Sequence, residues 1–258
     1  MARTFDLHRH LRLLIWNVAW AGPGSSRGAL IRKAIQRINP DILCLTETRE
    51  DFLPTEGYGI LSHSDYGYGT ARGRRKVALW SQLPWSQVDS HGSDELPGGR
   101  FITGVTGGIR MFGVCIPWQH AHVRTGRRDR APWEDHLAYL RALRPVLERY
   151  SSLPEPVCMA GDFNQRIPRR LQPEPVYQEL AHTLGENLKL ATGGMVDEHG
   201  AMLIDHIATD RRLSCRVEKI ISRFGPNGEE LSDHVGISAS INPLPGLEAQ
   251  SNASDWLG

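Results

Sequence analysis

The sequence predicts an α/β sandwich, with stacked β-sheets inside and helices outside. Three observations carry this prediction: short apolar segments occur throughout the chain, only two segments have helical periodicity, and no polar linker divides the core. Between residues 81 and 115 the strand-like segments follow one another without a helix, which predicts antiparallel neighbours there. The expected strands are residues 11–18, 41–47, 76–81, 100–106, 109–116, 156–162, 203–209, 215–221 and 235–241.

Two segments have apolar residues that recur at helical spacing, and we expect helices over residues 27–38 and 132–150. In the first segment these residues are Leu30, Ile31, Ala34, Ile35 and Ile38, and in the second they are Leu137, Leu140, Leu143 and Leu147. We therefore expect one domain over residues 1–242, followed by a flexible tail over residues 243–258.

The composition of the 258 residues is that of an ordinary globular protein, with 40% hydrophobic residues, 23% charged residues and a formal net charge of +1. The chain has no apolar stretch of signal-peptide or membrane-span length, so we expect a cytoplasmic protein with no membrane partner. No sequence feature indicates a protein partner. Four widely spaced cysteines without a CxxC pair are expected to be buried thiols: Cys44, Cys115, Cys158 and Cys215.

Three basic clusters lie in segments rich in Gly or Pro, which places them in expected loops. They are "RGRRK" (72–76), "RTGRRDR" (124–130) and "RIPRR" (166–170). Any one cluster could be solvated surface, but three together favour an anionic partner such as nucleic acid, because clustered Lys and Arg create a local positive field. The candidate substrate contacts in these clusters are Arg74, Arg75, Arg127 and Arg128.

Polar side chains lie at or beside the ends of five expected strands. A turn could account for any one of them, because Asn and Asp are common at strand ends. Five such sites, drawn from oxygen ligands and one His, are better explained by one functional site. The residues are Asn17, Glu47, Asp162 with Asn164, Asp205, and Asp233 with His234.

The chemistry of these side chains suits a phosphoester hydrolase. Asn17, Glu47 and Asp233 offer the oxygen ligands that a hard cation such as Mg²⁺ or Mn²⁺ prefers. Such a cation would neutralise charge that develops on a phosphoryl oxygen.

The remaining side chains suit proton transfer and phosphate binding. Asp162 could position or deprotonate a water molecule, with Asn164 holding the phosphate. His234 would be a cationic donor to the same phosphate, with Asp205 as the carboxylate that favours its protonated form.

These residues resemble the endonuclease/exonuclease/phosphatase superfamily of the deoxyribonuclease I and exonuclease III type. The matching segments, in the order of the family, are "IWNVAW", "PDILCLTETR", "KVALWSQLP", "GDFN", "LIDHI" and "SDHVGIS", which span residues 11–241. The resemblance implies a four-layered α/β sandwich with two stacked mixed β-sheets flanked by helices, and residues 1–242 as its catalytic domain. It also implies metal-dependent phosphoester hydrolysis.

The resemblance also implies a role for each residue of the motifs. Glu47 would be the principal metal ligand, assisted by Asn17 and Asp233. Asp162 would align the water, Asn164 would contact the phosphate, and Asp205 would orient His234. Arg49 matches an Arg of deoxyribonuclease I and is a candidate contact to the substrate phosphate.

One position departs from the family pattern. After the middle strand the family usually places a His or Tyr directed at the phosphate, whereas "GVCIPWQHAH" has Pro117 and Trp118 first. His120 could reach the phosphate if the loop turns back after Pro117, and it is a catalytic candidate; the alternative is an exposed loop His. His122 is a weaker candidate.

The leading hypothesis is a nuclease or phosphodiesterase that cleaves nucleic-acid phosphodiester bonds, supported by the basic clusters. A phosphatase or phosphodiesterase acting on a small or lipid phosphoester is the closest alternative, because one fold and site can serve many phosphoesters. A module that binds nucleic acid or a phosphorylated partner without catalysis is the alternative of another class.

Overall fold

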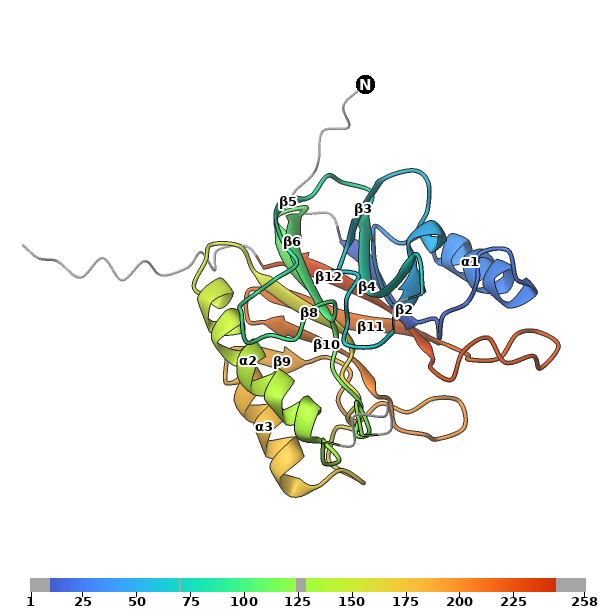
Figure 1. Ribbon diagram of the computed structural model, residues 1–258. Helices are drawn as coiled ribbons and strands as arrows, with labels where there is room; N and C mark the ends of the chain where they lie inside the picture. Colours follow the sequence, from blue (N-terminus) through green and yellow to red (C-terminus); the bar gives the residue numbers. More distant parts are fainter. Residues whose placement is uncertain (1–9, 70, 124–128, 245–258) are drawn as a thin grey trace, which may run out of the picture.

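Two six-stranded mixed sheets stack face to face, and helices cover both outer faces (Figure 1). The computed structural model describes residues 10–69, 71–123 and 129–244. Helix α1 (Ser26–Ile38) lies beside the first sheet, whereas α2 (Glu134–Ser151) and α3 (Glu174–Leu184) lie together on the outer face of the second. The four-layered α/β sandwich predicted from the sequence is therefore confirmed.

The first sheet has the strand order β11-β12-β1-β2-β4-β3. β1 runs parallel to β2 and antiparallel to β12, which makes the sheet mixed. A short 3₁₀ helix, η1 (Glu50–Phe52), follows β2. The strands are β1 (Leu11–Asn17), β2 (Ile42–Arg49), β3 (Tyr58–Leu61), β4 (Arg74–Ser81), β11 (Leu213–Ile221) and β12 (Gly236–Pro243).

The second sheet has the strand order β5-β6-β7-β8-β10-β9. Its only parallel pair among the described residues is β7 with β8, and the antiparallel pairing predicted between residues 81 and 115 is confirmed in β5, β6 and β7. The strands are β5 (Ser86–Asp89), β6 (Phe101–Thr106), β7 (Ile109–Cys115), β8 (Val157–Asp162), β9 (Leu188–Leu190) and β10 (Asp205–Asp210).

The central strands are apolar on both faces because each face packs against another layer. In β1, Leu13 and Ile15 face the core between the sheets, whereas Leu14 and Trp16 face the layer of α1. Strands buried on both sides have continuous apolar runs, and this is why the sequence indicates them so clearly. All four cysteines are free. Cys44, Cys115 and Cys158 belong to this core, and Cys215 is half-buried and packs against it.

Five elements are not predicted from the sequence: η1, α3, β3, β5 and β9. The "RGRRK" cluster was expected in a loop, but its last three residues belong to β4, because β4 continues its antiparallel pairing with β2 as far as Arg74. The tail expected from residue 243 lies outside the described residues from residue 245 onward. In the described part of the chain, no helix is long and apolar enough to span a membrane.

Candidate active site

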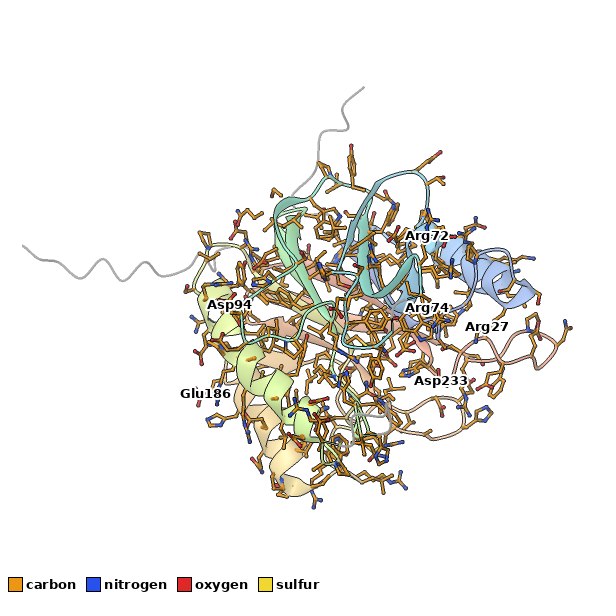
Figure 2. The ribbon with its side chains drawn as sticks, viewed as in Figure 1. Arg27, Arg72, Arg74, Asp94, Glu186 and Asp233 are labelled. Carbon is orange, nitrogen blue, oxygen red and sulfur yellow. The ribbon has the colours of Figure 1, made fainter. Side chains whose placement is uncertain are left out.

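A cleft of about 440 Å³ lies where strands of both sheets end. It is lined by the last residues of β1, β7 and β8, together with residues of β2, β4 and the loop before β12. In Figure 2, Arg74 of β4 and Asp233 of that loop lie on the same side of the molecule, away from Asp94 and Glu186. Seven residues predicted for the site line this cleft: Asn17, Glu47, Arg74, Asp162, Asn164, Asp233 and His234.

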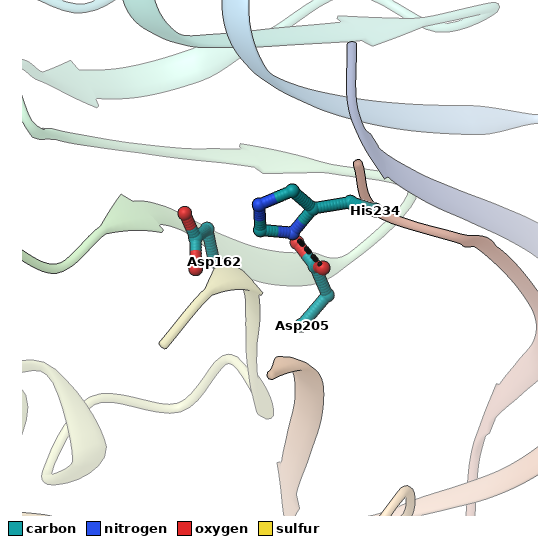
Figure 3. A group of neighbouring side chains, drawn as sticks. All are labelled: Asp162, Asp205 and His234. Carbon is teal, nitrogen blue, oxygen red and sulfur yellow. Dashed lines mark hydrogen bonds and ion pairs between the residues drawn. The ribbon is translucent and has the colours of Figure 1, made fainter. Parts of the chain in front are cut away.

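His234 is held in place by an ion pair and by its backbone. Its Nδ1 lies 2.5 Å from Oδ2 of Asp205, the first residue of β10, as Figure 3 shows. The backbone N–H of His234 donates to Ser232 Oγ at 3.2 Å, and the indole Nε1 of Trp16 donates to the His234 carbonyl at 3.1 Å. Asp205 lies behind the ring and outside the cleft lining, which leaves Nε2 on the side of the cleft.

The two carboxylates near His234 determine its charge. Burial alone would lower the pKa of His234, but Asp205 and Asp162 outweigh it and raise the pKa to about 10. The ring is therefore an imidazolium at neutral pH, and both ring nitrogens carry a proton. With Nδ1 bound to Asp205, Nε2 is the ring nitrogen on the cleft side, where it lies 3.4 Å from Asn17 Nδ2 and 3.9 Å from Asp233 Oδ1.

Asp162 lies at the end of β8 with its carboxylate almost completely buried. Its Oδ2 accepts from Asn17 Nδ2 at 3.1 Å, and its Oδ1 accepts from the backbone N–H of Asn164 at 3.0 Å. Burial, with smaller contributions from Asp205 and Glu47, raises the pKa of Asp162 to about 7, although His234 opposes the shift. A carboxylate with such a pKa can accept a proton at neutral pH.

The turn after β8 requires an unusual backbone. Gly161 has φ +136°, and a Cβ at this position would lie 2.1 Å from the carbonyl oxygen of Val114 in the adjacent strand. Asn164 has φ 53°, and its Nδ2 donates to the Ile116 carbonyl at 2.9 Å. The "GDFN" motif thus combines a glycine that permits close strand contact with two polar side chains that line the cleft.

Among the described residues, one group of three His and Asp side chains has ligand atoms close enough to hold a metal ion. The ligand atoms of Asp162, Asp205 and His234 lie within 4.8 Å of one another. A protonated His234 has no lone pair to offer, so this group suits proton transfer better than metal binding. Glu47, the predicted principal metal ligand, lines the same cleft but is not part of this group, and its Oε1 lies 2.5 Å from Nζ of Lys76.

Several residues of the cleft wall were not predicted as site residues. Arg100 is buried; its Nη1 donates to the Cys115 carbonyl at 3.3 Å, and its Nη2 has no hydrogen-bond partner among the described residues. Lys76 is also part of the cleft wall, and it belongs to the "RGRRK" cluster. The only sequence signal for Arg100 is its place after Gly99, at the start of an expected strand. The other unpredicted wall residues are Trp20, Tyr66, Tyr68, Gly69, Cys115 and Trp118.

The structure separates the predicted arginines. Arg74 lines the cleft, with its guanidinium 4.8 Å from the ring centroid of Trp20. Arg75 instead forms an ion pair with Glu50 at 2.5 Å. Arg49 donates from Nε to Asp51 at 3.3 Å, and neither Arg49 nor Arg75 is part of the lining. Arg127 and Arg128 lie outside the described residues.

His120 is not part of the cleft lining. Its ring packs edge-on against Trp118 with centroids 5.2 Å apart, and it is Trp118 that lines the cleft. His122 lies farther along the loop, where it contacts Asp135 and stacks on Tyr68 with centroids 4.5 Å apart. The loop after β7 therefore contributes Trp118 to the cleft lining, and neither His120 nor His122 is part of that lining.

Several solved structures share this fold. An AP endonuclease from Archaeoglobus fulgidus is 19% identical, with a TM-score of 0.63 over 89% of this chain and 98% of that one. The human nocturnin catalytic domain with bound sulfate is 18% identical, with a TM-score of 0.64 over 93% and 97%. The 3′ phosphatase NExo from Neisseria, bound to product DNA hairpin, is 17% identical, with a TM-score of 0.63 over 89% and 98%.

A comparison with curated proteins finds no significant match. The sequence model of one family, however, matches residues 14–234, which include every described site residue from Asn17 to His234. The family comprises endonucleases, exonucleases and phosphatases, which hydrolyse phosphoesters. The chain belongs to the Endonuclease/Exonuclease/phosphatase family.

Proposed function

We propose that the protein is a metal-dependent nuclease or phosphodiesterase that hydrolyses phosphodiester bonds of nucleic acid. The observation that carries the proposal is the His234–Asp205 ion pair beside the buried Asp162 carboxylate, in a cleft that also contains Glu47. In this arrangement His234 can donate a proton to a substrate in the cleft, Asp162 can accept one, and the Glu47 carboxylate can bind a cation.

The residues around Glu47 fit Mg²⁺ or Mn²⁺. Glu47 faces the cleft and already attracts a cationic group at 2.5 Å, and Asn17 and Asp233 add oxygen atoms to the same lining. Carboxylate and amide oxygens are the donors that these hard cations take. When bound, the cation would neutralise charge that develops on the phosphoryl group.

In the proposed reaction, Asp162 accepts the proton of the attacking water, because its pKa of about 7 leaves much of it ionised at neutral pH. His234 donates from Nε2 to a phosphoryl oxygen, and Asp205 keeps the ring charged and oriented. Arg100, whose Nη2 has no protein partner among the described residues, would bind another phosphoryl oxygen.

The cleft wall favours nucleic acid over a small phosphoester. Trp20, Tyr66, Tyr68 and Trp118 offer aromatic faces or edges on which bases or sugars can pack, and Arg74 adds a positive charge at the rim. The names of structural neighbours point the same way, since they include an AP endonuclease, a 3′-5′ exonuclease from Neisseria meningitidis and a DNA-bound 3′ phosphatase.

A substrate panel tests the proposal. The full chain would be incubated with Mg²⁺, Mn²⁺ or EDTA and single-stranded DNA, duplex DNA with and without an abasic site, RNA, and an aryl phosphomonoester. We expect cleavage of at least one nucleic acid, loss of activity in EDTA, and turnover at least about 100-fold lower for Asp162→Asn. Full activity in EDTA would contradict the metal dependence. Efficient hydrolysis of the monoester alone would favour the small-phosphoester alternative, and binding without product would favour the non-catalytic one.

A further inference from the structure

Lys76 pairs with Glu47 because of the strand register. β2 and β4 are antiparallel, with Thr46 opposite Val77 and Thr48 opposite Arg75, so Glu47 and Lys76 lie between these two pairs. Glu47 departs from extended backbone there, with φ 47°. The flanking pairs hold the two residues close together, and Nζ of Lys76 lies 2.5 Å from Oε1 of Glu47.

The surroundings hold the Lys76 ammonium at this point. Only 10% of its side chain is exposed, compared with 24% for Glu47. The ammonium lies 5.1 Å from the ring centroid of Trp20 and 5.8 Å from that of Tyr66, and both rings line the same cleft. Aromatic faces attract a cation, so the position of Nζ is stabilised by one carboxylate and two rings.

We propose that Lys76 is a tethered cation that neutralises Glu47 in the metal-free protein, and that a divalent ion must displace it to bind. The inference rests on the proposed metal-dependent function. A divalent ion on Glu47 and an ammonium on the same carboxylate would repel each other at contact distance. Lys76 would therefore weaken metal binding and raise the metal concentration that is needed to occupy the site.

Binding of Mn²⁺ to the full chain, followed by electron paramagnetic resonance of the free ion, tests this inference without any substrate. Lys76→Met keeps an unbranched side chain but removes the charge, and we expect it to lower the Kd for Mn²⁺ about tenfold or more. Lys76→Arg keeps the charge and should bind Mn²⁺ within about threefold of the wild type. Glu47→Gln should bind more weakly than either.

Arg74→Met is the matched control. It removes one positive charge from the same cleft and from the same Trp20 ring. In the strand register, however, the backbone of Arg74 lies opposite Arg49. If Lys76 acts by direct competition, Arg74→Met should change the Kd much less than Lys76→Met. A similar gain from both variants would show a general field effect and overturn the inference.

A second measurement covers the metal-free state. In EDTA, Lys76→Met should melt at a lower temperature than the wild type, because Glu47 loses its counterion. Mn²⁺ should raise the melting temperature of Lys76→Met by more than it raises that of the wild type. An unchanged or weaker Mn²⁺ affinity in a folded Lys76→Met or Lys76→Gln variant would overturn the inference but leave the proposed function standing. Failure of Mn²⁺ to bind the wild type and every variant would overturn both.

Discussion

The two central ionisable residues have opposite protonation preferences, and this difference assigns their roles. His234 has a pKa raised to about 10 because two carboxylates outweigh its burial, whereas Asp162 has a pKa raised to about 7, mainly by burial. At neutral pH one group holds its proton and the other can accept one. A pair of groups separated in this way is what acid–base catalysis at neutral pH requires.

The His234–Asp205 pair should make stability depend on pH. The folded pKa of His234 lies above the unfolded value of 6.5, so the stabilisation is complete below pH 6.5 and is lost as pH rises toward 10. We expect urea denaturation in EDTA to show that His234→Gln lowers the free energy of unfolding by an amount on the order of a few kcal/mol at pH 6, and by much less at pH 10.

The control for this measurement is His91→Gln. His91 also pairs with an aspartate, Asp94, but their side chains are 74% and 96% exposed, so the pair should contribute little. A difference between wild type and His234→Gln that stays constant from pH 6 to pH 10 would contradict an ionised His234.

At the scale of elements, strand alternation separates residues that the sequence places side by side. Arg74 and Lys76 line the cleft, whereas Arg75 between them pairs with Glu50. Side chains in a strand point alternately to opposite faces, so a basic cluster in a strand cannot act as one patch. The sequence suggested one patch because Gly73 and its neighbours resemble a loop, and the strand is extended only by its pairing with β2.

The elements missed from the sequence are mostly those that depend on their neighbours. β9 has three residues and pairs only with β10, and β5 pairs with β6 through an irregular register. Such short edge strands carry little local signal. The central strands and the first two helices, in contrast, were predicted because burial imposes a strong apolar pattern on them. Helix α3 is the exception, because its buried residues Val176, Leu180 and Leu184 do recur at helical spacing.

The close contact of β7 with β8 predicts a strong effect of Gly161→Ala. The new Cβ would lie 2.1 Å from the Val114 carbonyl oxygen, and a φ of +136° is itself unfavourable for alanine. We expect a loss of roughly 2–4 kcal/mol in the free energy of unfolding and a fall in turnover, because Asp162 follows directly.

Gly24→Ala provides the comparison for Gly161→Ala. A Cβ at Gly24 meets nothing within 4 Å, so its unfolding free energy in urea should stay within about 0.5 kcal/mol of the wild type. Equal stability of the two alanine variants would show that the strands separate easily at Gly161.

At the scale of the whole molecule, the sequence identified the reactive groups better than the walls around them. Asn17, Asp162 and Asp205 lie at strand ends, and their position follows from local pattern. The walls come from distant segments that meet only after the two sheets stack, as with Tyr68 and Arg100. No short-range pattern marks such residues. In the loop after β7, for example, Trp118 lines the cleft and the predicted His120 does not.

Arg74 lines the cleft whereas Arg75 does not, and this difference predicts unequal roles in nucleic-acid binding. In an Asp162→Asn background that slows cleavage, we expect Arg74→Gln to weaken binding of a DNA duplex several-fold and to reduce the slope of log Kd against log salt by about 0.9, the value for one lost phosphate contact in duplex DNA. Arg75→Gln should change neither quantity appreciably, because Glu50 already neutralises this side chain. Fluorescence anisotropy over a series of salt concentrations measures both quantities. Equal effects of the two substitutions would mean that DNA follows the edge of β4 instead of entering the cleft, and a flat salt dependence in every variant would point to a small phosphoester as the substrate.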